Sequence, residues 1–377
     1  MGDVVDAALS VQPLVRERAD ACEENRDLTV DIVDALVEAG LMRLCVPRVY
    51  DGPEATPMQL VEAVEAVAEA DGAAGWCVMI ASTSSSMSLF LPPDVAREIY
   101  ADPGVVTAGA FAPSGSARAD GDGWTVSGRW AWGSATHHCQ WVLGGCIAET
   151  PASADGEFHL MFVPAEHATF HDNWDPIGLR GTGSGDFELV DAVVPTGFSV
   201  RPGVTAPVVD TPLARFPNFT LLAMAVAATT LGIARHAVDE AVALAQVKTP
   251  MHARRRLGQS ATAQIELSRA EARLGAGRAF LLDAIGGAWD DAVRGDRVTV
   301  ETRARIRLAA LHAVESAVAA TDAAYTLAGG SAVPRSHPLQ RCLRDIHTAT
   351  QHVMVSPRLH ETIGRVLLGE RVDTATL

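Results

Sequence analysis

The sequence predicts an α+β protein in which a helical region, a strand-rich region and a second helical region follow one another. Three observations support this prediction. Apolar residues recur at helical spacing over residues 1–110, alternate with polar residues over 111–205, and return to helical spacing in alanine-rich segments over 215–377. A chain of 377 residues, of which 48% are hydrophobic, can bury a substantial core. We therefore expect an N-terminal helical domain, a middle β domain and a C-terminal helical bundle with these boundaries.

In the first region, the clearest helix begins at Thr56-Pro57-Met58-Gln59. A threonine N-cap, a proline at the first helical position and a glutamine at the third form a capping box. The apolar residues that follow share one face until Asp71-Gly72 ends the helix: Leu60, Val61, Val64, Val67 and Ala68. The segment from Thr29 to Gly40 repeats this pattern and predicts another helix.

The strand-rich region begins near Val105, where the apolar spacing changes to two. The Asp122-Gly123 turn before Trp124 predicts a hairpin. Further strands are expected at Gln140–Ile147, Phe158–Val163 and Asp186–Val194. We expect these strands to form a compact antiparallel unit, either a small barrel or a sandwich.

The last region follows a proline-rich segment, 202–217, that is typical of a linker. Long helices are expected from Phe219 to Gly329, with interruptions near Thr249-Pro250 and Gly286-Gly287, and one more helix after Pro338. The uncharged run 216–234 approaches transmembrane length, but it contains proline, asparagine and three threonines. We expect a buried core helix there and no membrane span.

Charge and cysteine usage exclude several classes of function. The formal net charge is −16, and the only basic run is Arg254-Arg255-Arg256, so we expect no binding to nucleic acid or anionic membranes. Lys248 is the only lysine, which excludes a P-loop lysine and disfavours Schiff-base chemistry. The six cysteines are scattered, with no C-x-x-C spacing, and the chain begins without a basic, then apolar, leader. These features predict a reduced, cytoplasmic protein.

Several segments carry a resemblance to a known family. The run Ile177–Asp186, which reads IGLRGTGSGD, resembles a signature of acyl-CoA dehydrogenases. The strand exit Asp191–Pro195, the glycine pair in Ala328–Ser331, and Arg344-Asp345 resemble other segments of that family, in the same order. The resemblance implies an acyl-CoA dehydrogenase-like fold, with an N-terminal helical domain, a middle antiparallel β domain and a C-terminal four-helix bundle. It also implies a homotetramer.

The chain departs from this family at the catalytic base. Acyl-CoA dehydrogenases remove the substrate's α-proton with a glutamate at one of two places. This chain has no acidic residue between Asp210 and Asp239, and none between Asp345 and Glu361. The resemblance therefore implies an inherited fold and a changed reaction.

A second resemblance indicates which reaction. The segment Gly128–Trp141 is similar to the reduced-flavin-dependent monooxygenases built on this fold, which are oxygenase components of two-component aromatic hydroxylases and desulfurisation monooxygenases. Those enzymes show a tryptophan, an aromatic residue, serine-glycine, and a histidine with tryptophan three residues beyond. Ala135 replaces the glycine, and the matching residues are Trp130, Trp132, Ser134, His138 and Trp141. The same enzymes place a histidine near the position of the dehydrogenase glutamate, and His352 matches it.

The resemblance implies roles for these residues. Ser134 is expected near flavin N5, where a hydroxyl slows the loss of hydrogen peroxide. His352 is expected to deprotonate a phenol-like substrate or to assist departure of the distal oxygen, although whether His347 or His352 faces the flavin stays open. The three tryptophans would form dry walls that exclude water. The structural alternatives are a serine that satisfies a turn, a core histidine, and tryptophans of the β-domain core.

The flavin implied by the resemblance is FMN or FAD in reduced form, and its expected contacts come from four parts of the chain: Trp132, Ser134, Arg180, Thr182, Ser184, Arg254, Gln264, Gly329 and Gly330. Arg254 and Gln264 resemble the region where this fold contacts flavin across a subunit boundary, and a solvated basic turn is the alternative. The spacing of Gly181, Gly183 and Gly185 does not match a dinucleotide fingerprint. No metal is expected, because adjacent histidines on a strand, His137 and His138, point to opposite faces and lack a third ligand.

The expected substrate pocket contains Trp76, Ser84 and His138. Many aromatic hydroxylases of this type carry a further histidine in the early helical domain, whereas this chain has the serine-rich run Ala81–Met87. Serines cannot act as that base. The departure leaves room for N- or S-oxygenation, or for a retained dehydrogenase-like activity.

Together these features predict a flavin-dependent monooxygenase. It would take FMNH2 or FADH2 from a separate NAD(P)H flavin reductase, because no nicotinamide site is visible. With O2 it would oxygenate a small aromatic or heteroatom-bearing substrate through a C4a-hydroperoxyflavin. The alternatives are a FAD-containing acyl-CoA dehydrogenase-like oxidoreductase and a non-catalytic flavin-fold protein.

Overall fold

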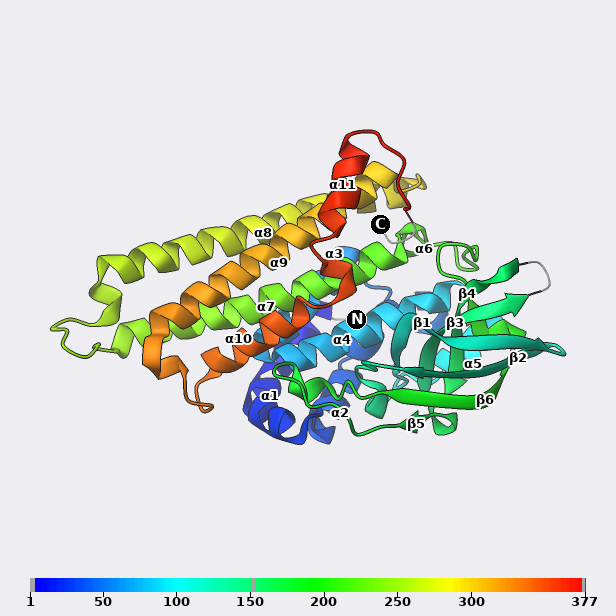
Figure 1. The fold of residues 1–377 in the computed structure, drawn as a ribbon, viewed down its shortest axis with the longest axis horizontal. Helices are drawn as coiled ribbons and strands as arrows, with labels where there is room; N and C mark the ends of the chain where they lie inside the picture. The colour runs from blue at the N-terminus through cyan, green and yellow to red at the C-terminus, as the bar shows by residue number, and fades with distance from the viewer. Residues whose placement is uncertain (1–3, 151–152, 375–376) are drawn as a thin grey trace.

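The computed structural model describes residues 4–150, 153–374 and 377. Helices of the last third of the chain extend away from a β-sheet, and the N-terminal helices pack alongside both (Figure 1). The secondary structure changes from helix to strand at Thr107 and returns to long helices at Asn218. The predicted order of helices, strands and helices is therefore confirmed.

The N-terminal region contains five α-helices: α1 (Val4–Asn25), α2 (Val30–Glu38), α3 (Pro57–Ala70), α4 (Gly72–Ser85) and α5 (Pro93–Tyr100). The capping box of α3 is present, because Gln59 N–H donates to Thr56 Oγ1 at 3.2 Å and Thr56 N–H donates to Gln59 Oε1 at 3.0 Å. Asp71 ends α3 and begins α4 at once, accepting a hydrogen bond from Ala74 N–H. This cap fixes the direction of α4, which leads into the candidate site.

The strands form one seven-stranded sheet with the order β5-β6-β2-β1-β3-β4-β7. Their bounds are β1 (Thr107–Asp120), β2 (Gly123–Trp130), β3 (Trp141–Thr150), β4 (Ser153–Pro164), β5 (Thr169–Phe170), β6 (Phe187–Pro195) and β7 (Ser199–Val200). The sheet is mixed, and not purely antiparallel as expected, because β1 pairs with β3 in parallel. The reason is that β6 occupies the place beside β2, so β3 runs back along the opposite side of β1. The described strands form this single sheet and not the two sheets of a sandwich.

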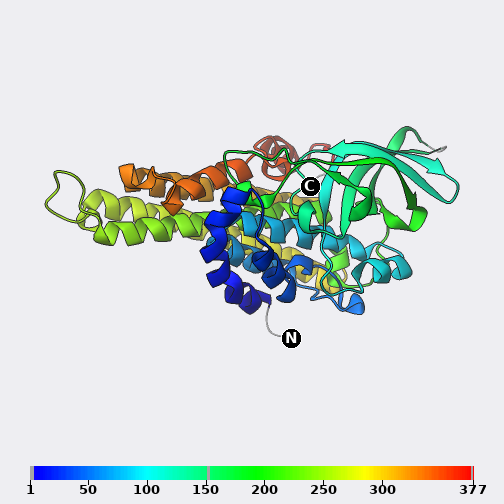
Figure 2. The same ribbon diagram turned by 90° about the horizontal axis from the view of Figure 1, so that it is seen from below.

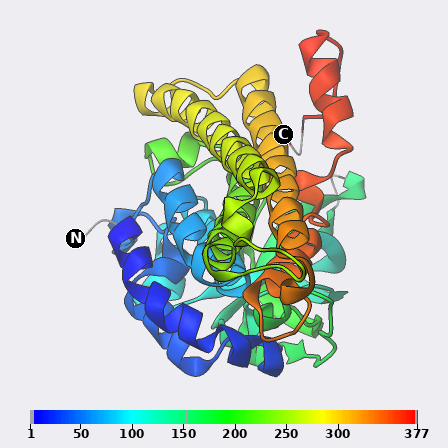
Figure 3. The same cartoon turned by 90° about the vertical axis from the view of Figure 1, so that its left-hand side faces the viewer.

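The C-terminal region contains α6 (Pro212–Arg215), α7 (Asn218–Val247), α8 (Ala261–Arg294), α9 (Val300–Ala328), α10 (Pro338–Ala349) and α11 (Leu359–Leu367). Helices α7, α8 and α9 contact one another, and α10 lies against α7 and α9, as the view from the far end of the bundle shows (Figure 3). The predicted break near Pro250 is confirmed, but the break at Gly286-Gly287 is wrong. Both glycines lie inside α8, because packing against α9 offsets the helix cost of about 1 kcal/mol per glycine.

Helix α7 is long and apolar enough to cross a membrane by length and composition. In the structure, 89% of its most apolar window is buried inside the protein. It contacts α3, α4, α8, α9 and α10, so it is a buried core helix, as expected.

Four segments far apart in the sequence converge where the sheet meets the helices. These are α4, the loop between β2 and β3 with the short 3-10 helix η4 (Thr136–His138), the loop before β6 with η6 (Arg180–Thr182), and the segment after α10 with η10 (Val353–Val355). Figure 2 shows the same junction of sheet and helices from below. The predicted catalytic residues lie on these segments.

Candidate active site

A buried cluster of hydroxyl groups joins three of the four segments. Trp76 Nε1–H on α4 donates to Ser134 Oγ at 3.0 Å. Ser134 Oγ lies 2.6 Å from Ser184 Oγ, and Ser184 Oγ lies 2.6 Å from Thr182 Oγ1. All four side chains are buried. We call Ser134, Thr182 and Ser184, with Trp76, the hydroxyl cluster.

The cluster has one consistent direction of proton donation. Thr182 donates its only hydroxyl proton to the backbone oxygen of Leu179 at 2.8 Å. Ser184 must then donate to Thr182, and Ser134 must donate to Ser184. Ser134 also receives the Trp76 N–H, so its oxygen keeps one free lone pair. Toward any further partner, Ser134 therefore acts as a hydrogen-bond acceptor.

Backbone hydrogen bonds hold the two loops of the cluster together. Gly133 N–H donates to Gly185 O at 2.9 Å, and Ala135 N–H donates to Thr182 O at 3.2 Å. Trp132 and Ala135, on either side of this loop, have positive φ angles of 64° and 60°. Such angles are strained for residues other than glycine, which explains why the resembling enzymes carry glycine at the position of Ala135.

His352 completes the site from the C-terminal region. We expected His352 inside the helix after Pro338. It instead follows the end of α10, and its backbone is extended. Its ring lies edge-on to Trp76 with the centroids 5.6 Å apart, and its Nδ1 accepts a hydrogen bond from Met354 N–H at 3.3 Å. Burial, followed by the positive charge of Arg307, lowers the pKa of His352 to about 4. The ring is therefore neutral at pH 7, with its proton on Nε2.

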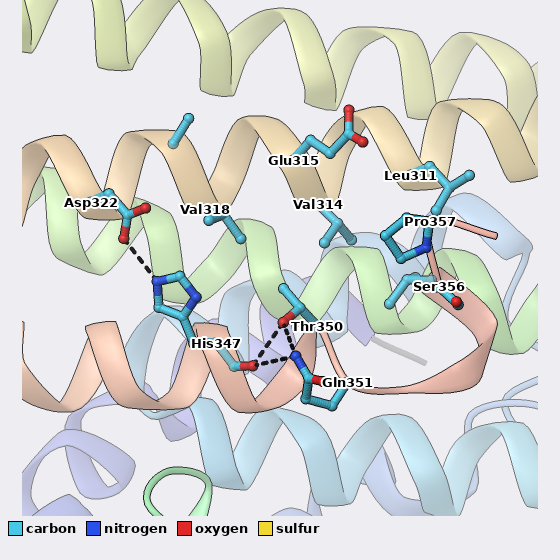
Figure 4. Close-up of a pocket in the computed structure, with 12 residues that line it drawn as sticks. Leu311, Val314, Glu315, Val318, Asp322, His347, Thr350, Gln351, Ser356 and Pro357 are labelled. Carbon is cyan, nitrogen blue, oxygen red and sulfur yellow. Dashed lines mark hydrogen bonds and ion pairs between the residues drawn. The ribbon is translucent and has the colours of Figure 1, made fainter. Parts of the chain in front are cut away.

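His347, the other candidate histidine, points elsewhere. Its Nε2 lies 2.9 Å from Asp322 Oδ1 on α9, in a groove of about 570 Å³ between α9, α10 and η10 (Figure 4). Neither Trp76 nor Ser134 lines this groove. Among the described residues, His352 contacts the hydroxyl cluster through Trp76, whereas His347 contacts Asp322.

His137 and His138 are not arranged as the sequence predicted. His137 and His138 lie on a 3-10 helix and not on a strand, so their rings do not point to opposite faces. His137 Nδ1 and His138 Nε2 both contact the carboxylate of Asp27, at 2.8 and 2.9 Å. Burial raises the pKa of Asp27, but hydrogen bonds from the two histidines outweigh it and hold that pKa well below its usual range. His138 is thus occupied by Asp27 and does not point freely into a substrate pocket.

Across residues 4–150, 153–374 and 377, no group of three or more His, Cys, Asp or Glu side chains is arranged to hold a metal ion. Asp27 instead fixes η4 against the loop that carries Ser184, because a Cβ on Gly183 would lie only 2.5 Å from Asp27 Oδ1.

The three tryptophans do not form one aromatic wall. Trp130 is fully buried in the sheet, where it stacks on Phe187 and donates to Gly145 O at 2.8 Å. Trp141 stacks on Phe198. Trp132, by contrast, is 73% exposed and lies two residues before Ser134. Trp130 therefore fits the alternative of a core residue, and Trp132 alone of the three is exposed.

The remaining predicted residues divide into two places. Arg180 bonds to Asp175 and to the backbone oxygens of Pro176 and Glu23, so it fastens the η6 loop. Ser84 is buried in α4, beyond Trp76. The others lie at the far end of the bundle, in the loop between α7 and α8, at the start of α8 and at the end of α9 (Figures 1 and 2): Arg254, Gln264, Gly329 and Gly330. Within one chain, these four residues are therefore not brought to the hydroxyl cluster.

Sequence reasoning assigned no role in the site to two charged groups that lie near it. Asp345 on α10 accepts a 2.6 Å hydrogen bond from Leu179 N–H and so ties α10 to the η6 loop. Arg307 on α9 is 1% exposed and touches Met354, two residues after His352. A sequence signal for Arg307 existed, because it interrupts the apolar stripe formed by Ala304, Leu311 and Val314. No comparable signal marked Asp27, which belongs to a polar loop.

Comparison with known proteins identifies both helical regions. Residues 7–91 match the family model described as "Acyl-CoA dehydrogenase, N-terminal domain", and residues 224–357 match "Acyl-CoA dehydrogenase, C-terminal domain". The chain is 30% identical to an indole-3-acetate monooxygenase of Pseudomonas putida over 361 residues, covering 95% of this chain and 92% of that one. It is 28% identical to the oxygenase subunit HsaA of a flavin-dependent monooxygenase from Rhodococcus jostii, covering 92% of each.

Two solved structures share the fold of this chain over nearly its whole length. The 3-HSA hydroxylase from Rhodococcus sp. RHA1 superimposes with a TM-score of 0.93 and 26% identity, covering 100% of this chain and 99% of that one. The structure of XiaF from Streptomyces sp., in complex with FADH2 and glycerol, has a TM-score of 0.92 and 24% identity, covering 98% and 96%. The likeness to XiaF shows the fold alone.

Proposed function

Because the chain belongs to the acyl-CoA dehydrogenase family, and its relatives there are flavin-dependent monooxygenases, we propose that it oxygenates a small aromatic substrate with O2 and reduced FMN or FAD. One observation carries the proposal. Where a dehydrogenase needs a carboxylate, this site presents a hydroxyl cluster and a neutral histidine. None of the hydrogen bonds recorded for Ser134, Ser184 or His352 among the described residues involves a carboxylate.

The residues beside the cluster fit a flavin ring. Trp132 offers an exposed aromatic face, and Ser134 lies two residues farther along the same loop. Ser134 and Trp132 would hold the ring, while Thr182 and Ser184 support Ser134 from behind. When bound, the reduced flavin supplies the electrons that activate O2.

The direction of proton donation assigns a task to Ser134. Its free lone pair accepts a hydrogen bond, which suits the N5–H that reduced flavin carries and the free N5 of oxidised flavin does not. By holding that proton in place when the flavin is bound, Ser134 would oppose the loss of hydrogen peroxide, which requires the proton to leave. Burial of the cluster also excludes the water that would otherwise compete for the same proton.

The tautomer of His352 favours one of its two expected roles. Because Nδ1 is occupied by Met354 N–H, the neutral ring presents Nε2–H as a donor. A donor assists departure of the distal oxygen and cannot remove a proton from a phenol. We therefore propose that His352 is a hydrogen-bond donor during oxygen transfer.

The substrate is proposed to be aromatic on two grounds. The relatives include an indole-3-acetate monooxygenase, named for an aromatic substrate. In this chain, Trp76 lies against His352, and Phe219 lies edge-on to Phe111 with centroids 6.5 Å apart. We propose Trp76 and Ser84 on α4 as walls of the substrate pocket, and His138 as a support of the η4 loop.

Two further proteins or subunits are implied. The HsaA relative is an oxygenase subunit, and a separate flavin reductase accordingly supplies reduced flavin. We also propose a homotetramer in which Arg254, Gln264, Gly329 and Gly330 contact the flavin of a neighbouring subunit, because they lie at the far end of their own bundle. Light scattering tests the assembly, and a monomer would contradict it.

All six cysteines are unpaired and buried, in line with a reduced, cytoplasmic protein.

Stopped-flow spectroscopy tests the proposed function. Anaerobic protein with FMNH2 or FADH2 is mixed with oxygenated buffer, and the near-ultraviolet absorbance of oxygenated reduced flavin is followed. We expect a transient that persists in the native protein and decays about tenfold or more sooner in Ser134→Ala, the effect of losing one hydrogen bond. Ser116→Ala, on the exposed part of β1, is the matched control and leaves the lifetime unchanged. Immediate oxidation of both flavins by the native protein would sink the proposal.

A further inference from the structure

Arg307 on α9 is a buried cation without an acidic partner among the described residues. Its side chain is 1% exposed, and its Nη1 contacts Phe219 O and Met354 Sδ, both at 3.3 Å. Its Nε and Nη2 atoms are buried and have no hydrogen-bond partner. A guanidinium has five N–H donors, so most of the hydrogen-bonding capacity of Arg307 is unused.

Other buried arginines of this chain are compensated differently. Arg341 pairs with Asp20 and lies 3.9 Å from both Glu23 and Asp71. Arg43 donates to two backbone oxygens and has Tyr100, Asp102 and Asp51 nearby, which partly oppose the effect of its burial, although its Nε also lacks a hydrogen-bond partner. For Arg307, burial alone lowers the pKa to about 10, with no acidic group opposing it. The chain itself therefore provides a counter-charge for its other most deeply buried arginines but not for Arg307.

The two free nitrogens form a particular geometry. Nε–H and one N–H of Nη2 point the same way from one edge of the guanidinium plane. This edge is the fork that binds both oxygens of a carboxylate through parallel hydrogen bonds. The nitrogen that is already occupied, Nη1, lies outside this fork. Arg307 thus keeps free the edge that a carboxylate requires.

Arg307 lies next to the candidate active site. Met354, which touches Arg307, follows His352 by two residues in the same short segment. The positive charge of Arg307 contributes to the lowered pKa of His352, so the two groups are within electrostatic reach. Phe219, whose backbone oxygen Arg307 contacts, carries the aromatic ring that packs against Phe111. Arg307 thus touches both the segment that carries His352 and the start of α7, which carries Phe219.

We propose that Arg307 binds a carboxylate carried by the aromatic substrate, through Nε and Nη2. The proposal rests on the proposed function and narrows its substrate class to anionic aromatic compounds. An unpaired buried charge destabilises a fold, and a substrate carboxylate removes that cost when it binds. Met354 is the side chain that gives way, because its three rotatable bonds let it move aside.

The first experiment compares charged ligands with uncharged ligands of nearly the same shape. Dissociation constants are measured anaerobically, with reduced flavin present, for benzoate, phenylacetate and indole-3-acetate and for the amide of each. We expect at least one acid to bind the native protein tenfold to a hundredfold more tightly than its amide. Arg307→Met abolishes this preference, and Arg307→Lys keeps part of it. No preference for any acid in the native protein, or a preference that survives Arg307→Met, would overturn the proposal.

A second experiment uses stability, which a purely structural arginine would affect in the opposite direction. Without ligand, Arg307→Met raises the Tm, because a methionine of similar length buries no charge. The preferred acid raises the Tm of the native protein but not that of Arg307→Met. The control is Arg305→Met, on the same helix but exposed and paired with Asp283, and it keeps the response to the acid. A lower Tm for unliganded Arg307→Met would assign Arg307 to the fold and overturn the proposal.

The phosphate of the flavin is the other anion that the Arg307 fork would bind. Affinities of FMN and riboflavin are therefore compared in both proteins. Under the proposal, their ratio is unchanged in Arg307→Met, whereas a ratio that falls toward one would assign the fork to the phosphate. The proposed function fails separately, since it depends on the oxygen-dependent transient. A persistent transient without preference for any acid contradicts only the role of Arg307.

Discussion

The hydroxyl cluster and the Arg307 fork lie at the same site but differ in how their polar groups are satisfied. Ser134, Ser184 and Thr182 form an ordered chain of hydrogen bonds that ends at Leu179 O. Arg307 leaves two nitrogens without a partner in an equally buried position. Folding thus satisfies the hydrogen bonds of the hydroxyl cluster but leaves two nitrogens of Arg307 without a partner.

The difference indicates which parts of the site are set before ligands bind. A satisfied network in a buried place is rigid and costs little to keep. An unsatisfied cation costs stability until a ligand provides the counter-charge. We infer that the flavin side of the site is preorganised by folding, whereas the substrate side gains order when the substrate binds.

The largest expected effect comes from breaking the preorganised side at Gly183. This glycine has a φ of 57°, and an added Cβ would lie 2.5 Å from Asp27 Oδ1 and 3.2 Å from His137 Nδ1. Gly183→Ala therefore combines backbone strain with a steric conflict, and we expect it to destabilise by about 3 kcal/mol. Denaturant unfolding measures the change, together with faster decay of the oxygen-dependent transient.

Gly203→Ala is the matched control for this change. Gly203 also has a positive φ, 77°, but nothing lies within 4 Å of an added Cβ. It should lose only the strain of the left-handed conformation, about 1 kcal/mol, with an unchanged transient. Equal losses in the two variants would show that the contact between Gly183 and Asp27 does not set the loop.

A smaller, pH-dependent effect is expected at Asp345, which joins the η6 loop to α10. Burial, followed by the nearby Asp71, raises the pKa of Asp345 to about 7. Between about pH 4 and pH 7, the folded protein therefore holds a proton that the unfolded chain has lost. Stability from this group is present below pH 4 and is lost as the pH rises through 7. Asp345→Asn keeps an oxygen for Leu179 N–H and removes the titration.

We expect Asp345→Asn to match the native protein at pH 4 and to exceed its stability by on the order of 2 kcal/mol at pH 8. Thermal unfolding at a series of pH values measures this difference. Asp94→Asn, at an exposed position of α5, is the control for the loss of one carboxylate. A native-like slope in Asp345→Asn would place the proton on another group.

The sequence could predict the order of elements and the residues of the hydroxyl cluster, because both depend on local pattern and motif. Ser134, Thr182 and Ser184 lie in short segments with a family resemblance, although the hydrogen bonds between them were not foreseen. What sequence could not predict are pairings set by tertiary placement. The parallel pairing of β1 with β3 follows from β6 lying beside β2. The hydrogen bonds of Asp27 to His137 and His138 join positions more than 100 residues apart.

The smallest expected effect concerns Ala135, where the resembling enzymes carry glycine. Its φ of 60° costs an alanine about 1 kcal/mol, and the strain lies one residue after Ser134. Ala135→Gly relieves the strain but gives the unfolded chain more freedom, so the net gain in stability should be about 0.5 kcal/mol. Because the backbone bond from Ala135 N–H to Thr182 O remains possible, the oxygen-dependent transient should keep its lifetime. A shorter transient, measured by stopped flow, would instead mean that the stiffness of alanine contributes to the preorganisation of Ser134.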